Sequence, residues 1–274
     1  MNQKWVFSPY LIWMIIFILI PLVLVVYYGV TIDTDTGVTL SLDNFKRLME
    51  PVYFKVFTRS IQLAAISTVI CLLVGYPIAM ILAGSTFRHK SIMVMLFVLP
   101  MWMNFLLRTY AWLTILERNG ILNTLLSFIG LPTINILYTE TAVILGMVYN
   151  FLPFMVLPIY SVISKIDHSL IEAAEDLGAN STTVFRRVVL PLSLPGVMSG
   201  ITMVFMPAVT TFVISRLLGG GQHTLIGNLI EQQFLLVGDW QFGSTISLVM
   251  MVIILISMAV MSKFEGQERG GALW

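Results

Sequence analysis

Six stretches of the sequence carry no charged residue and are long enough, or nearly so, to cross a lipid bilayer. They cover residues 5–32, 60–87, 91–107, 141–164, 188–215 and 240–262. A helix needs about 20 mostly apolar residues to span the hydrocarbon core. Because backbone N–H and C=O groups cannot stay unpaired in lipid, such stretches form helices rather than open strands. The sequence therefore predicts an all-α integral membrane protein with six transmembrane helices.

The composition agrees, since 58% of the residues are hydrophobic and 11% are charged, against about 25% charged in soluble domains. The single cysteine, Cys71, excludes an intrachain disulfide and is expected to be a small core residue. The first apolar stretch is too long for a signal-peptide core and lacks a small-residue cleavage site, so we expect a retained helix despite Lys4 before it. One domain, residues 1–274, is expected, with spans at roughly 6–30, 60–83, 91–116, 141–163, 190–214 and 242–262.

The distribution of lysine and arginine suggests an orientation with both termini in the cytoplasm. That orientation places eight basic residues in short cytoplasmic segments: Lys4, Arg88, Lys90, Lys165, Arg186, Arg187, Lys263 and Arg269. Seven lie in the longer outer segments: Lys46, Arg47, Lys55, Arg59, Arg108, Arg118 and Arg216. The density of positive charge is therefore higher inside, as the positive-inside rule requires.

Three connections between the spans have their own character. In the loop at 33–59, Ser41 or Asp43 is positioned to cap a short amphipathic helix at the outer interface. The brief turn around residues 84–90 predicts antiparallel, neighbouring helices. Residues 119–139 are uncharged but interrupted by glycine, asparagine and proline, which favours a short outer helix packed on the bundle over a seventh span.

Several spans contain proline, which a membrane helix tolerates when neighbours satisfy the freed carbonyls. The positions are Pro21, Pro77, Pro100, Pro153, Pro158 and Pro207. Simple kinks explain them, and pivots for alternating access are the functional alternative.

The loop at 164–189, between the fourth and fifth spans, is unusually charged for this chain. Ser169 and Glu172 have the spacing of a capping box, which predicts a short helix over residues 170–177. Gly178 follows where a left-handed residue closes a helix. Asn180 or Ser181 then caps a second short helix containing Arg186 and Arg187, before prolines lead into the fifth span. This loop is either a solvated connection or a docking surface for a partner.

The spacing within this loop resembles the EAA signature of ABC-importer permeases. The matching residues are Glu172, Ala173, Ala174, Gly178, Val188, Leu190 and Pro191, with valine at 188 where isoleucine is usual. The resemblance implies a type I ABC importer permease fold. It also implies a cytoplasmic coupling helix that docks on a separate ATPase subunit, with Glu172 as the docking acid and Gly178 as an elbow.

Nothing in the sequence supplies an energy source of its own. There is no Gly-Lys pair and hence no phosphate-binding P-loop, and His89, His168 and His223 are scattered. We therefore expect no catalytic residue, no metal site and no cofactor in this chain, with ATP and Mg²⁺ bound by the partner ATPase. An ion-coupled secondary transporter would need midplane acids and inverted repeats, and an intramembrane enzyme would need paired His/Asp or metal ligands; none is apparent.

Within this family the chain is most similar to polyamine permeases for spermidine and putrescine. The resemblance runs through residues 75–83, 99–112, 148–161, 172–179, 226–235 and 239–244. It implies a multi-pass protein of the bacterial cytoplasmic membrane. The expected partners are a second permease subunit, two ATPase subunits and an extracellular polyamine-binding protein. Permeases for thiamine, iron or another small solute are the nearest alternatives.

Polyamine ammonium groups favour carboxylates and aromatic faces. Candidates for the substrate path are Trp102, Tyr110, Tyr149, Phe151, Phe212, Glu231 and Asp239. Ordinary packing is the alternative for the aromatic residues, and an outer-loop surface position for the two acids. Arg108 opposes a cation path, because an ionisable residue within a span is functional by default. Either Arg108 reaches the outer interface beside Tyr110 and Trp112, which we favour, or the acids that bind the cation come from the partner permease.

Overall fold

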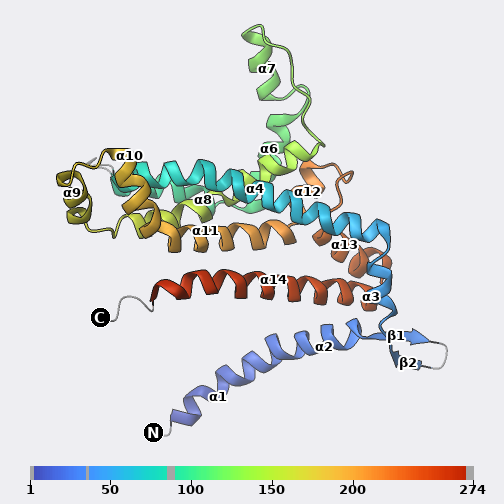
Figure 1. Ribbon diagram of the computed structural model, residues 1–274. Coiled ribbons are helices and arrows are strands. Elements are labelled where there is room, and N and C mark those ends of the chain that lie inside the picture. The colour runs from blue at the N-terminus through green and yellow to red at the C-terminus, as the bar shows by residue number, and fades with distance from the viewer. Residues whose placement is uncertain (1–2, 35–36, 85–89, 270–274) are drawn as a thin grey trace.

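The computed structural model describes residues 3–34, 37–84 and 90–269, and the long helices lie side by side (Figure 1). The central group comprises α4 (Pro51–Gly84), α8 (Glu140–Ile163) and α11 (Leu190–Thr210), with α14 (Trp240–Arg269) beside α11. We call the end of this bundle that carries α9 (His168–Asp176) the α9 end. The opposite end carries a small hairpin and is called the hairpin end. Helix α1 begins and α14 ends at the α9 end.

Glycine allows α8 and α11 to pack closely. A β-carbon at Gly196 would stand 2.9 Å from the Pro158 carbonyl oxygen, and one at Gly200 would stand 2.8 Å from Met155 Sδ. Met155 and Ile159 are fully buried at this contact. Cys71 is also fully buried and unpaired by disulfide, which confirms the small core residue expected from the sequence.

The first helix is peripheral. It runs through α1 (Gln3–Met14), one π-helical turn η1 (Ile15–Leu19) and α2 (Ile20–Gly29), and its side chains in α2 are mostly exposed. It rests on α14, where the Thr245 hydroxyl donates to the Gly29 carbonyl at 2.9 Å. An apolar helix that the chain itself leaves uncovered suits a lipid-facing or partner-facing position.

The segment after α2 forms the hairpin end. Strands β1 (Thr31–Thr34) and β2 (Gly37–Leu40) pair antiparallel, and α3 (Asp43–Leu48) follows. A short helix is therefore present where the sequence predicted one. The Ser41 hydroxyl accepts the Asp43 N–H at 3.0 Å just before it begins.

The span expected over residues 91–116 is bent into two helices. The chain forms α5 (Lys90–Trp102) and α6 (Phe105–Leu116), and the axis turns by 92° at the break between them. The side chain of Asn104 caps α6 by accepting the N–H groups of Leu106 and Leu107 at 2.8 and 3.3 Å. A strong N-cap residue four positions after Pro100 starts a new helix in a new direction. Helices α4 and α5 contact each other, as the short turn predicted, while His89 lies outside the described residues.

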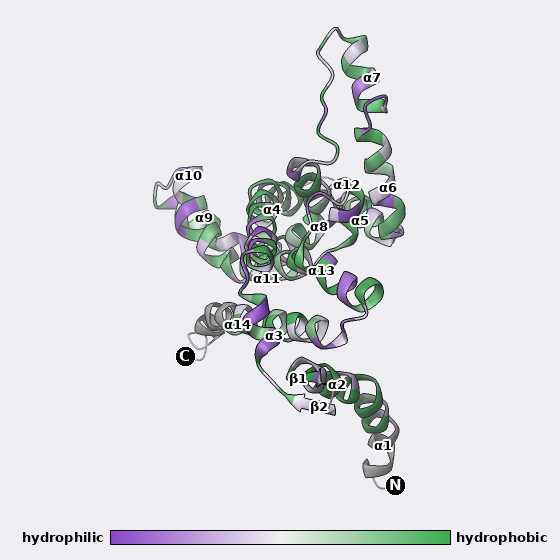
Figure 2. Cartoon of the chain, turned by 90° about the vertical axis from the view of Figure 1, so that its right-hand side faces the viewer, coloured by the Kyte–Doolittle hydropathy of each residue, from purple (hydrophilic) through white to green (hydrophobic). Residues whose placement is uncertain are grey.

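Residues 119–139 contain one short helix, α7 (Ile121–Phe128), followed by an extended return to α8. The expected short helix is present, but it does not pack along the bundle. It continues from α6 and projects away from the other helices (Figures 1 and 2). The Asn123 side chain holds the extended return, donating to the Ile134 carbonyl and accepting the Ile134 N–H. We call α6 and α7 together the α6–α7 arm.

The fifth span also ends earlier than the expected residue 214. Helix α11 ends at Thr210, and two non-helical residues separate it from α12 (Val213–Leu218). Helix α13 (Ile226–Gln232) and the π-helical turn η3 (Gln233–Val237) lead back to α14. The Asn228 side chain donates to the Phe212 carbonyl, so this backbone group at the break between α11 and α12 has a hydrogen-bond partner.

Candidate functional site

The charged loop at the α9 end begins with a helix whose cap differs from the expected one. Asp167, rather than Ser169, is the N-cap of α9, and its carboxylate accepts the Ser169 N–H at 3.0 Å. That hydrogen bond lowers the pKa of Asp167 below its usual value of 3.8. Ser169 lies inside the helix, and Glu172 approaches His168 at 3.2 Å instead of closing a capping box. The capping-box prediction is therefore wrong, because an aspartate two residues earlier already supplies the acceptor.

Gly178 ends α9 in the left-handed conformation that the sequence predicted, with φ of 83°. Its N–H donates to the Glu175 carbonyl at 2.8 Å, and the Ala179 N–H donates to the Ala174 carbonyl at 3.0 Å. This pair of bonds is the Schellman arrangement, which pairs the last carbonyls of a helix. The chain direction after α9 is thus fixed by a glycine with no backbone strain.

The second helix of the loop is the beginning of the fifth span and not a separate short helix. Asn180 caps α10 (Ser181–Val184), accepting the Thr183 N–H at 2.9 Å. The π-helical turn η2 (Phe185–Val189) carries Arg186 and Arg187, and it continues without a break into α11. Residues Ser181–Thr210 form one helix of 30 residues. Helix α9 is therefore joined to a continuous helix through the short segment around Gly178.

A hollow of 420 Å³ lies between the two helices of the loop. Its lining residues are Ala174, Leu177, Gly178, Ala179, Thr183, Val184, Arg187 and Val188. Leu177, one of these lining residues, is 89% exposed. Glu172 and Ala173, which precede the lining residues in the sequence, are also exposed. Small residues, an exposed apolar side chain and an exposed carboxylate form a surface that another protein can bind.

The predicted substrate-path residues do not meet in one place. Phe151 is 7% exposed and packs in the core of this chain, and its place in the substrate path stays a prediction. Tyr149 packs edge-on against Trp112 with ring centroids 5.2 Å apart. Of the remaining aromatic candidates, Trp102 and Tyr110 are exposed on α5 and α6, and Phe212 is exposed at the N-cap of α12.

Each of the two candidate acids already has an arginine partner. Glu231 on α13 pairs with Arg216 on α12, and Asp239 pairs with Arg47 on α3 at 2.7 Å. A substrate ammonium group would have to displace an arginine at either position. No local pattern predicts these pairs, because the partners are 15 and 192 residues apart in the sequence.

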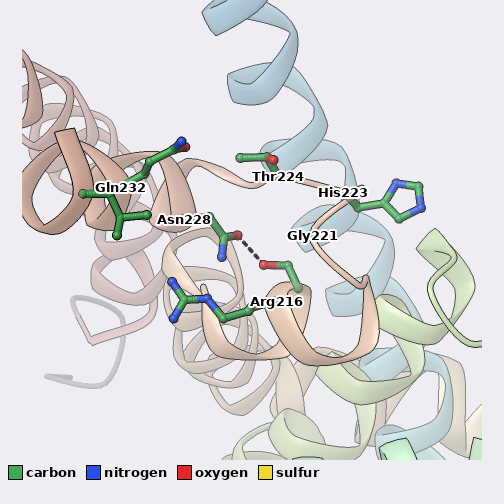
Figure 3. A pocket seen from close by; sticks show the side chains of 8 residues that line it. Arg216, Gly221, His223, Thr224, Asn228 and Gln232 are labelled. Carbon is green, nitrogen blue, oxygen red and sulfur yellow. Dashed lines mark hydrogen bonds between the residues drawn. The ribbon is translucent and has the colours of Figure 1, made fainter.

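A polar pocket of 160 Å³ opens beside Arg216 (Figure 3). Ser215 and Asn228 both line it, and the Ser215 hydroxyl donates a hydrogen bond to the Asn228 side chain. His223 and Gln232 lie on its rim. Within the part of the chain that the structure describes, no group of three histidine, cysteine or acidic side chains is arranged to hold a metal ion.

Arg108 is buried and does not reach the outer interface. The residue is 7% exposed, and its Nε and Nη1 atoms are enclosed without a hydrogen-bond acceptor. The interpretation that Arg108 extends to the interface beside Tyr110 is therefore wrong. Helix α6 packs against α12 and α8, and Arg108 lies on the buried side of this helix with Thr109.

Comparisons with known proteins agree with this architecture. Residues 1–266 match the family described as the binding-protein-dependent transport system inner membrane component. The chain is 38% identical over 253 residues to the spermidine/putrescine transport system permease protein PotB of Escherichia coli (strain K12), covering 90% of this chain and 92% of that protein. It is 41% identical over 255 residues to PotB of Haemophilus influenzae, covering 90% and 88%.

A solved structure gives the same fold. A bacterial ABC transporter involved in the import of the acidic polysaccharide alginate matches with a TM-score of 0.79, 17% sequence identity and 96% coverage of both chains. At that identity the match shows the fold alone. It confirms the type I permease fold that the sequence predicted.

Proposed function

This chain belongs to the binding-protein-dependent transport system inner membrane components, and from this membership we propose that it forms half of the translocation pathway of a polyamine importer. It is a PotB-type ABC importer permease by sequence and by fold. The substrate class, spermidine and putrescine, is inferred from relatives that are 38% and 41% identical over about nine-tenths of the chain. The observation that carries the mechanism is the exposed α9 surface joined through Gly178 to a 30-residue helix.

The proposed complex contains this chain, a second permease subunit, two ATPase subunits that bind ATP and Mg²⁺, and an extracellular polyamine-binding protein. The α9 end faces the cytoplasm, with both termini, and the hairpin end faces outward in a bacterial cytoplasmic membrane. When the ATPase subunits close on ATP, they move α9. The tight turn at Gly178 passes that movement to α11, which rearranges the bundle and opens the pathway to the outside.

The site residues have distinct parts in this proposal. Glu172, Ala173 and Ala174 present the carboxylate and the small face that the ATPase contacts, with Gly178 as the elbow. Arg186 and Arg187, on the exposed turn η2, add positive charge beside the contact. Trp102, Tyr110, Tyr149 and Phe212 remain candidates for contacts with the substrate, whereas Glu231 and Asp239 take part only if their arginine pairs open.

The substrate is tested by uptake of labelled spermidine, putrescine, thiamine and ferric iron in cells that have or lack the gene. We expect uptake of one or both polyamines to depend on the gene, and thiamine and iron uptake to be unaffected. Gene-dependent uptake of thiamine or iron, with polyamine uptake unchanged, would overturn the substrate assignment.

The coupling surface is tested by Glu172→Lys with Glu175→Lys as the matched control. Both side chains are exposed acids of α9, but only Glu172 belongs to the EAA signature. We expect Glu172→Lys to reach the membrane normally, to lose the co-purifying ATPase and to stop uptake, while Glu175→Lys keeps both. Equal ATPase recovery with the two variants would count against α9 as the coupling helix.

A further inference from the structure

Arg108 carries a charge that the described part of the chain does not balance. The residue is only 7% exposed, and neither Nε nor Nη1 has a hydrogen-bond acceptor. A buried guanidinium without a counterion or acceptor is strongly unfavourable, so buried arginines are almost always paired. The third nitrogen, Nη2, also makes no hydrogen bond within the described residues and is not among the enclosed atoms, so it is the one guanidinium nitrogen that a group outside the chain can reach.

The position of Arg108 on its helix increases the need for an anion. Arg108 follows the N-cap Asn104 by four residues, and the first turn of α6 contains no acidic residue. The N-terminus of a helix carries partial positive charge, which disfavours a nearby cation and attracts a carboxylate. A carboxylate at this point would compensate both the guanidinium and the helix end.

The α6–α7 arm leaves a broad apolar surface beside Arg108. Leu107 is 65% exposed, Tyr110 51%, Leu125 59% and Phe128 89%. Helix α7 projects from the bundle in both views (Figures 1 and 2), whereas α6 packs on α12 and α8 along one side and leaves Leu107 and Tyr110 exposed on the other. Exposed large apolar side chains on both helices of the arm suit a contact with lipid or with another protein.

The depth of Arg108 argues for a protein carboxylate over a lipid phosphate. Trp112, one turn after Arg108, contacts Tyr149 of α8. Tyr149 lies nine residues from the start of α8, about 14 Å into a helix about 36 Å long at 1.5 Å per residue. Lipid headgroups lie at the ends of such a helix and not at this depth. An ammonium substrate would be repelled by the arginine.

We propose that the α6–α7 arm is the contact surface for the second permease subunit, and that this subunit supplies a carboxylate that pairs with Arg108. The inference rests on the proposed function, because it needs a second membrane subunit in the complex. A carboxylate of the partner subunit would accept from Nη2, because Nε and Nη1 are enclosed by this chain, and such a charge-assisted hydrogen bond is stronger than a neutral one. The apolar side chains of the arm exclude water around that ion pair.

The contact is tested with a photo-crosslinking amino acid placed at Leu107 or Phe128 in the assembled importer. We expect ultraviolet light to join both positions to the second permease subunit, identified by mass spectrometry as a member of the same permease family. Cross-links from both positions only to lipid, or to the ATPase, would overturn the proposal. This experiment leaves Arg108 intact, so it tests the contact with the second permease subunit even if Arg108 variants fail to fold.

The ion pair is tested by charge exchange. We expect Arg108→Gln and Arg108→Glu to lower recovery of the second permease subunit by more than about tenfold, while Arg118→Gln, at an exposed arginine of the same arm, has no effect. Changing the acid nearest the cross-link to arginine should restore recovery with Arg108→Glu. Normal recovery with Arg108→Glu would overturn the proposal. An intact, cross-linked complex that takes up neither spermidine nor putrescine would refute the substrate and support the interface.

Discussion

The Nη1 atom of Arg47 donates a hydrogen bond to Oδ2 of Asp239 at 2.7 Å, although the two residues are 192 positions apart. The bond joins α3 at the hairpin end to the start of the last helix. The Arg47 guanidinium also lies 4.0 Å from the centre of the Phe242 ring, and Asp239 accepts the Phe242 N–H at 2.9 Å. The hairpin end is therefore attached to α14 by one arginine that makes two different contacts.

Replacing Arg47 with Met should remove this attachment and lower the stability of the protein by about 1 kcal/mol, since the pair is only partly buried. Thermal unfolding in detergent measures the effect. Lys46→Met is the matched control, because the Lys46–Asp43 pair is exposed and should be nearly neutral. Equal melting temperatures for the two variants would show that the Arg47 contacts do not stabilise the fold.

Substitutions at Gly178 should rank by their tolerance of a positive φ and not by size. A β-carbon there has no neighbour within 4 Å, so steric overlap is not the limit. A left-handed conformation costs an ordinary L-residue about 1–2 kcal/mol, and asparagine tolerates it best. We expect uptake to fall in the order Gly178→Asn, Gly178→Ala, Gly178→Val. Wild-type uptake with valine would mean that the turn does not transmit movement.

The membrane helices were predictable because a chain in hydrocarbon must pair all its backbone N–H and C=O groups, which a helix does by itself. Long charge-free stretches predict where the membrane helices lie. The spacing of glutamate, glycine and proline predicts the helix–turn–helix loop at the α9 end. The left-handed glycine was also predictable, since Gly178 follows a run of good helix formers.

The break after Trp102 was not predictable from hydropathy. Met103 and Asn104 continue an apolar, uncharged run, and only the capping geometry of Asn104 starts a helix in a new direction. The burial of Arg108 depends on the packing of α6 against α12 and α8. The N-cap at Asp167 could have been predicted from the sequence, because an aspartate before a helical stretch is a common N-cap. The pairing of Glu231 and Asp239 with arginines depends on tertiary packing and had no local signal.

The cap of α9 should weaken at acidic pH. The backbone hydrogen bond from Ser169 lowers the pKa of Asp167, so the carboxylate stabilises the folded helix above the unfolded pKa near 3.8. That stabilisation is lost as the pH falls through the lower pKa of the folded state. Hydrogen exchange of residues 168–177 measures it as a loss of protection below about pH 4. With Asp167→Asn, which keeps an acceptor oxygen but does not titrate, protection should not change with pH in this range.

Close packing of α8 against α11 should depend on Gly196. A β-carbon at this position would stand 2.9 Å from the Pro158 carbonyl oxygen and 3.1 Å from the Ile159 Cα, so the two backbones would have to separate. We expect Gly196→Ala to lower stability by about 1–3 kcal/mol, seen as a lower melting temperature in detergent. Gly84→Ala is the control, because a β-carbon there has no neighbour within 4 Å and alanine favours the helix. Gly196 lies on α11, the helix to which the proposed mechanism passes the movement of α9, so Gly196→Ala should also reduce uptake. A stable, fully active Gly196→Ala protein would show that α8 and α11 do not need to be in backbone contact.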